Sequence, residues 1–303
     1  MSKHFKLSSL AALITLLVVG WLAQRAALAI NWHAVAHAWA ALPPGRIAAS
    51  LVGSLVSFGM LALLDVLAAR VIADRRVSAK RAALAGAVSH AFSNTLGFPA
   101  VTGSVIRYRL YAAAGLGTGD IARIVALAAF GVAMGFTVVS TLALLWQPAL
   151  APGWGRPLGV LVCAALLGFV LWLRGGRRSV RIARWTLAFP DSATAALQMI
   201  VGGIEMLAAI GALYILLPPA IAPPFIDFLP IYVGAVMVGL VSNVPGGLGV
   251  FEVIVLAAFP AHARAEALAA MLCYRVTYSL VPFAVAGIGW LLFELRRAGP
   301  LQR

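Results

Sequence analysis

The sequence is poor in charge, and poorest in acidic charge. Nine Asp and Glu stand against 23 Lys and Arg in 303 residues, and charged residues make up 11% of the chain. Cysteine is also scarce: Cys163 and Cys273 lie in apolar segments, and their spacing suits neither a metal nor a disulfide framework. A phosphate-binding Gly-x-x-x-x-Gly-Lys motif is absent, which argues against ATP as the direct energy source. No polar segment is long enough to fold as a separate soluble domain.

Apolar residues are abundant instead, because 63% of the chain is hydrophobic and the mean hydropathy is +0.99. This composition predicts an all-α, polytopic integral membrane bundle. The predicted spans lie at residues 7–29, 46–69, 121–146, 156–173, 194–216 and 266–293. Two more apolar regions, 82–116 and 231–259, contain helix-breaking residues. Each is predicted to be a re-entrant hairpin or a pair of short spans.

Basic residues define the expected orientation. They cluster at both termini and in segments 70–81 and 174–184, whereas 147–156 and 217–230 contain only Arg156 between them. The positive-inside rule therefore predicts that both termini lie in the cytoplasm. The first apolar segment exceeds the roughly 7 to 15 residues of a signal-peptide core, so we interpret it as a retained helix.

A short motif occurs twice. Ser93-Asn94-x-x-Gly97 returns as Ser242-Asn243-x-x-Gly246, an offset of 149 residues (242 − 93). The same offset relates the predicted spans of the two halves, which favours a single transmembrane domain, 1–303, built from repeats 1–150 and 151–303. The two apolar regions that contain the motif must enter the membrane from opposite faces. The repeats are therefore predicted to have inverted topology around a midplane site.

Six charged residues fall in or beside apolar segments, where a charge costs on the order of 3 kcal/mol. They are Asp65, Arg107, Arg109, Glu205, Glu252 and Arg275. The planar donor fork of arginine matches a phosphate, so the arginines are candidate ligands of an anionic headgroup. Alternatively, the arginines pair with the carboxylates to neutralise buried charge. The two readings are compatible, and the three carboxylates are also the candidates for coupling to a proton gradient.

Two other features bear on ligand binding. The turn at Pro245-Gly246-Gly247 cannot be an ordinary helix interior, and its exposed amides suit an anion. His33 and His37 stand at i and i+4, but no acidic or thiol residue is near in sequence, so an interfacial helix with tryptophans at headgroup depth is the preferred interpretation. No metal or other cofactor is expected.

The two motifs carry a resemblance. Residues 93–103 and 107–111, together with 242–252, resemble the transmembrane region of lysylphosphatidylglycerol synthases. That resemblance implies a bacterial inner-membrane protein that moves lipid between leaflets, the role assigned to the flippase half of the multiple peptide resistance factor. It also implies that Asp65 and Arg70 form the family's acidic-to-basic pair. The 303 residues contain no aminoacyl-transfer domain, so a similarity to the stand-alone members of the family is expected, and with it a partner lipid-modifying enzyme or a different anionic lipid.

The predicted function is therefore a lipid flippase for an anionic or aminoacylated lipid, with no enzyme activity and no nucleic-acid partner. A small-solute or ion transporter is the alternative, and it should line its pathway with more than six or seven charged or amide side chains. A membrane-embedded transferase is less favoured, because His90 is the only histidine near a motif. The oligomeric state is left open, since the glycines of 131–135 suit packing inside one chain or between subunits. The candidate substrate-binding residues are Asp65, Arg70, Ser93, Asn94, Gly97, Arg107, Arg109, Tyr111, Glu205, Ser242, Asn243, Pro245, Gly246, Gly247, Glu252 and Arg275.

Overall fold

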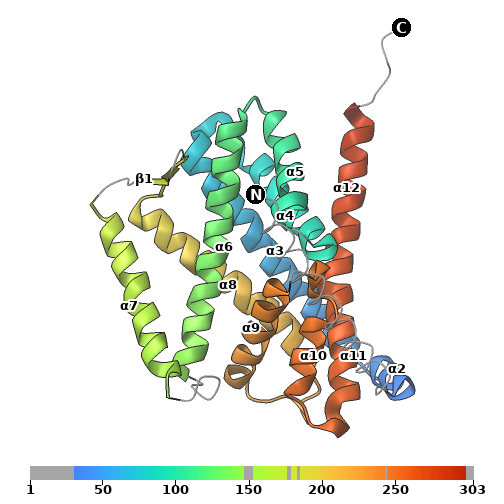
Figure 1. Ribbon diagram of the computed structural model, residues 1–303. Coiled ribbons are helices and arrows are strands. Elements are labelled where there is room, and N and C mark those ends of the chain that lie inside the picture. The colour runs from blue at the N-terminus through green and yellow to red at the C-terminus, as the bar shows by residue number, and fades with distance from the viewer. Residues whose placement is uncertain are drawn as a thin grey trace, which may run out of the picture.

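The protein is a bundle of helices, seen in the computed structural model of Figure 1. The structure describes residues 31–97, 99–146, 153–175, 179–182, 185–242 and 244–297. The predicted first span lies outside the described residues, as does Asn243.

Long apolar helices dominate the described part of the chain. Within it, five helical segments are long and apolar enough to cross a membrane. They are α3 (Pro44–Ala73), α6 (Thr118–Trp146), α7 (Gly155–Leu173), α8 (Ser192–Tyr214) and the stretch Ala261–Leu292. Their bounds lie within a few residues of the spans predicted from hydropathy. The prediction of an all-α polytopic membrane bundle is confirmed.

The last membrane stretch is not one regular helix. It consists of η4 (Ala261–Ala263), α11 (Arg264–Tyr274), the π-helix η5 (Arg275–Leu280) and α12 (Val281–Arg297). A π-helical turn widens the backbone and is frequent at functional sites. Here it begins at the one arginine predicted to lie inside this span.

The two apolar regions with breakers each fold as two helices. The first forms α4 (Ala79–Leu96) and α5 (Pro99–Ala112), and the second forms α9 (Phe225–Val241), the turn η3 (Pro245–Gly247) and α10 (Val250–Ala257). At 1.5 Å per residue, α5 with 14 residues and α10 with eight are both shorter than a hydrocarbon core of about 30 Å. Each pair is therefore a hairpin that reaches partway into the bundle.

Both breaks occur at the repeated glycine. Gly97 ends α4 with φ 76°, and Gly246 lies in η3 with φ 63°, a region of backbone space that favours glycine. The two breaks touch: a Cβ atom on Gly246 would lie 3.5 Å from the carbonyl oxygens of Asn94 and Thr95. Two segments about 150 residues apart in the sequence thus meet inside the bundle.

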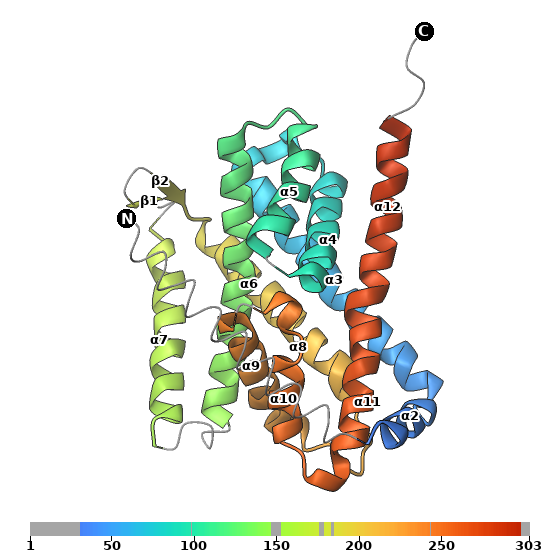
Figure 2. The same ribbon diagram turned by 45° about the vertical axis from the view of Figure 1, so that its right-hand side comes forward.

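The hairpins occupy different ends of the molecule. In Figures 1 and 2, α4 and α5 lie in the upper half, α9 and α10 lie in the lower half, and α6 runs past both. The order of helices after α3 also matches the order after α8. The inverted topology of the two repeats stays a prediction that this arrangement accommodates.

Helix α8 crosses the bundle in contact with α3 and α6. Asp191 starts it by accepting a hydrogen bond from the Thr194 amide at 3.0 Å. Where α8 meets α6, Gly202 lies so close that a Cβ atom on it would stand 2.6 Å from the Gly131 carbonyl oxygen. The glycines of 131–135 therefore pack inside this chain, against α8.

Two local features complete the fold. Antiparallel strands β1 (Ser179–Ile182) and β2 (Trp185–Ala188) form a short hairpin at the basic segment 174–184. Helix α2 (Trp32–Ala40) packs on α11 and exposes Trp32 at 53% and Trp39 at 39%. Exposed tryptophans on a short helix suit the predicted interfacial position.

Candidate functional site

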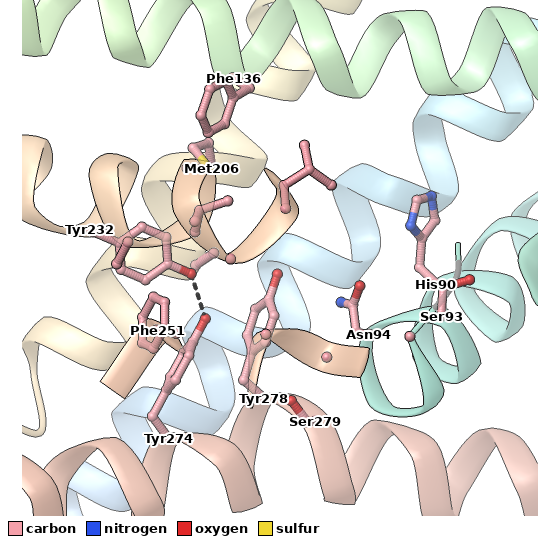
Figure 3. Close-up of a pocket in the computed structure, with 18 of the residues that line it drawn as sticks. His90, Ser93, Asn94, Phe136, Met206, Tyr232, Phe251, Tyr274, Tyr278 and Ser279 are labelled. Carbon is pink, nitrogen blue, oxygen red and sulfur yellow. Dashed lines mark hydrogen bonds between the residues drawn. The ribbon is translucent and has the colours of Figure 1, made fainter. Parts of the chain in front are cut away.

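A cavity of about 370 Å³ lies where the two broken hairpins meet. Its walls come from both halves of the chain, with α4, α6, α8, α9, η3 and η5 all contributing. Figure 3 shows His90, Ser93 and Asn94 of α4 on one side, and the rings of Tyr232 and Tyr274 on the other. We call this space the first cavity. Its lining is mostly apolar, with a few polar groups from the broken segments.

A second cavity, of about 440 Å³, adjoins the same break. Four residues line both cavities, and we call them the junction: Asn94, Gly246, Arg275 and Ser279. Each cavity also has an apolar side chain exposed at the bundle surface, Leu240 at 67% in the first and Leu248 at 58% in the second. Both spaces thus border on the surface that faces lipid.

Arg275 is the cation of the junction. Its Nε donates to Glu252 Oε1 at 2.8 Å, and its Nη1 donates to the Gly246 carbonyl oxygen at 2.9 Å. Glu252 Oε2 in turn accepts from the Gly249 amide at 2.8 Å. The Arg–Glu pair therefore satisfies backbone groups that the break takes out of helical pairing, as a membrane interior requires.

A second ion pair is buried away from the cavities. Arg107 binds Asp65 through both carboxylate oxygens, at 2.8 and 2.7 Å, and Tyr111 donates to the same carboxylate at 3.2 Å. His90 Nε2 lies 3.0 Å from Arg107 Nη2. Because a guanidinium can only donate, His90 Nε2 accepts, and the imidazole is neutral with its proton on Nδ1. His90 is therefore a hydrogen-bonded residue inside the bundle.

These two ion pairs agree with the interpretation in which arginines neutralise the carboxylates in apolar segments. Asp65 is fully buried and its partner is Arg107 rather than Arg70, which the resemblance grouped with it and which is exposed at the end of α3. The reason is steric, since Asp65 packs on Gly86 of α4, where a Cβ atom would lie 2.8 Å from the carboxylate. The carboxylate therefore points into the bundle, toward α5.

The third buried carboxylate has no cationic partner at all in the described residues. Glu205 Oε1 accepts from the Ser57 hydroxyl at 2.8 Å and from the Tyr278 hydroxyl at 3.2 Å. Those two hydroxyls also lie 2.9 Å from each other. Glu205 is 7% exposed and lines the first cavity.

The structure brings about half of the candidate residues together. Ser93, Asn94, Gly97, Glu205, Gly246, Gly247 and Arg275 line the first cavity, and Glu252 lines the second. Pro245 begins η3, and the Ser242 hydroxyl bonds the Gly239 carbonyl oxygen nearby. Arg107 and Tyr111 are buried with Asp65 outside both cavities, and Arg109 is exposed.

The sequence analysis missed the hydroxyl groups of the cavity. Tyr232 and Tyr274 share a hydrogen bond of 2.8 Å, and Tyr274 stacks on Tyr278 with ring centroids 4.9 Å apart (Figure 3). Tyr274 and Tyr278 stand at i and i+4 in the last span. That spacing places two phenols on one face of an apolar helix, and it was the signal available in the sequence.

Two known proteins are similar to this chain over most of its length. No family model matches it. It is 29% identical over 274 residues to the uncharacterized protein slr0712 of Synechocystis sp., covering 88% of this chain and 84% of that protein. It is 26% identical over 251 residues to the inner membrane protein YbhN of Escherichia coli, covering 79% and 77%. The chain is thus a multi-pass membrane protein related to YbhN.

A third similarity is local. Over 64 residues the chain is 39% identical to phosphatidylglycerol lysyltransferase of Staphylococcus aureus, which is 20% of this chain and 8% of that protein. The resemblance noted at the motifs is therefore supported over one segment. Of the two relatives that match most of the length, YbhN is named as an inner membrane protein, and neither name specifies a cargo.

Proposed function

We propose that the protein moves a lipid with an anionic headgroup between the two leaflets, with the headgroup passing the junction and the acyl chains remaining in the bilayer. The observation that carries this proposal is the pair of cavities on either side of the meeting point of two broken hairpins, with Arg275 lining both. Broken helices near a midplane are a recurring way to build a transport site.

Lateral access supports a lipid over a soluble cargo. The exposed leucines at the cavity edges, Leu240 and Leu248, leave the headgroup sites in contact with the bundle surface. The charged or amide side chains among the described lining residues of the two cavities are Asn94, Glu205, Glu252 and Arg275. These four are fewer than the more than six or seven expected along a pathway for a hydrophilic solute.

Arg275 is the proposed headgroup ligand. Its guanidinium holds Glu252 through Nε alone, and its Nη1 donates to the Gly246 carbonyl oxygen, so a headgroup phosphate can replace Glu252 as the acceptor and use further donors of the guanidinium. The similarity of one segment to phosphatidylglycerol lysyltransferase makes phosphatidylglycerol the first lipid to test. An anionic headgroup is what the charge of the junction favours.

The test is leaflet exchange in liposomes reconstituted with the purified protein, using fluorescent phosphatidylglycerol and fluorescent phosphatidylcholine in parallel. The key variant is Arg275→Gln with Glu252→Gln, which removes both charges together and so leaves neither buried and unpaired. We expect the wild type to prefer phosphatidylglycerol. We expect the variant to lose about tenfold or more of that rate, because a hydrogen bond to a charged group is worth about 1.5–3 kcal/mol.

The matched control removes an ion pair outside the cavities. Arg76 and Asp120 form an exposed pair at 3.0 Å, so Arg76→Gln with Asp120→Asn should exchange phosphatidylglycerol at the wild-type rate. Unchanged selectivity in the Arg275 and Glu252 variant would remove the junction pair from headgroup recognition. Exchange of neither lipid by the wild type would contradict the proposed function and favour a solute cargo.

A further inference from the structure

Glu205 differs from the two other buried carboxylates. Arg107 binds Asp65 and Arg275 binds Glu252, whereas Glu205 is held only by hydroxyl groups. In the part of the chain that the structure describes, no Lys, Arg or His forms an ion pair with Glu205 within 4.0 Å. An ionised carboxylate buried without a cation is strongly disfavoured in a medium of low polarity.

The groups that face Glu205 are nearly all uncharged. Ser57 of α3 and Tyr278 of η5 donate to its carboxylate, and the first cavity that it lines also has the phenols Tyr232 of α9 and Tyr274 of α11 and apolar side chains that include Leu61 of α3 and Val132 and Phe136 of α6. Helix α7 contributes no residue to the first cavity among those described.

Two basic side chains, Arg275 and His90, also line the first cavity, but each is bound to other groups. The Arg275 guanidinium is bound to Glu252 and to the Gly246 carbonyl oxygen. His90 accepts a hydrogen bond from Arg107 and is therefore neutral. Neither compensates a negative charge at Glu205. A proton on the carboxylate would neutralise that charge without any rearrangement of side chains.

We infer that Glu205 is a proton-binding site, and that an anionic headgroup occupies the first cavity together with a proton on Glu205. This inference rests on the proposed function. An ionised Glu205 and a headgroup phosphate in one cavity of about 370 Å³ would repel each other, whereas a protonated Glu205 removes that repulsion and can donate a hydrogen bond.

The position of the site also links the two halves of the chain. Ser57 belongs to α3 in the first half, while Glu205 and Tyr278 belong to α8 and η5 in the second. Both hydroxyls donate to Oε1, so a proton on Oε2 leaves their direction unchanged but weakens both bonds, because a neutral carbonyl oxygen is a poorer acceptor than a carboxylate oxygen. Proton binding therefore changes the contact between the halves at the place where alternating access requires movement.

The test compares wild type, Glu205→Gln and Glu266→Gln in phosphatidylcholine liposomes, with fluorescent phosphatidylglycerol exchange measured from pH 5 to 9. The glutamine at 205 keeps the shape and the hydrogen-bonding capacity of the protonated acid. We expect the wild-type rate to fall by up to tenfold per pH unit above its midpoint, as the protonated fraction does. Glu205→Gln should exchange the lipid at a rate independent of pH. Glu266 is exposed at the start of α11, so its variant should keep the wild-type profile.

A second variant and a second measurement test the proton site without relying on the Glu205→Gln variant alone or on lipid exchange. Ser57→Ala removes one donor to the carboxylate, which should move the midpoint of the wild-type profile to higher pH. Infrared difference spectra should show a protonated carboxyl band that titrates in wild type and is missing in Glu205→Gln. An unchanged pH profile in Glu205→Gln, or a carboxyl band that persists in it, would overturn the inference. Absence of exchange in the wild type would contradict the proposed function, and the infrared titration would then decide the proton site alone.

Discussion

Arg107 connects three helices by hydrogen bonds. It extends from α5 to Asp65 on α3 and donates to His90 on α4, and its side chain is only 7% exposed. Breaking a buried ion pair by removing one partner costs about 3–5 kcal/mol, because the other charge is left unpaired. The Arg107–Asp65 pair therefore stabilises the packing of the first hairpin, α4–α5, against α3.

Substituting Arg107→Gln should therefore lower the stability of the folded protein by about 3–5 kcal/mol, measured by chemical denaturation in detergent micelles. The double variant Asp65→Asn with Arg107→Gln should recover part of the loss, since no charge then stays buried. Arg76→Gln removes half of an exposed pair, with side chains 58% and 25% exposed, and should cost less than about 1 kcal/mol. Equal losses in the two single variants would show that burial of the Asp65 pair is unimportant.

At the scale of elements, α6 and α8 can approach each other closely because glycines lie where they cross. Gly202→Ala would place a Cβ atom 2.6 Å from the Gly131 carbonyl oxygen, so the helices must separate. We expect a loss of stability of about 1–3 kcal/mol, the usual range for overpacking, seen as a lower midpoint in thermal unfolding.

The same helix offers the control for this prediction. A Cβ atom on Gly211 would meet nothing within 4 Å, and alanine in a helix is favoured over glycine by about 0.5–1 kcal/mol. Gly211→Ala should therefore keep or slightly raise the unfolding midpoint. If both substitutions gave the same change, close approach of the helices would not be what Gly202 provides.

Hydropathy predicted the membrane elements well because it depends on local composition. The spans at α3, α6, α7 and α8 were each placed within a few residues, and Gly97 and Gly246 marked the breaks. Partner choice was not predictable in the same way. Asp65 lies five residues from Arg70 in sequence but binds Arg107, because which groups meet across a bundle depends on helix rotation and on small residues such as Gly86.

At the scale of the whole molecule, the predicted inverted repeat has a consequence for the side of the membrane on which each loop lies. The hairpin α4–α5 is flanked by exposed Ser78 and Gly117, and the hairpin α9–α10 by exposed Ala220 and His262. If the halves are inverted, the first two positions share one face of the membrane and the last two share the other. By the positive-inside rule, the basic cluster beside α4 predicts that the first face is the cytoplasmic one.

Cysteine labelling can test this arrangement, because only Cys163 and Cys273 need to be removed first. In right-side-out and inverted vesicles, Ser78→Cys and Gly117→Cys should react with a membrane-impermeant maleimide only from the cytoplasmic side. Ala220→Cys and His262→Cys should react only from the opposite side. The decisive position is 262, since His262 and Arg264 put basic charge on a loop expected to face outward. Reaction of His262→Cys from the cytoplasmic side would mean that α9 and α10 cross the membrane once between them, which is incompatible with an inverted repeat and with alternating access built on it.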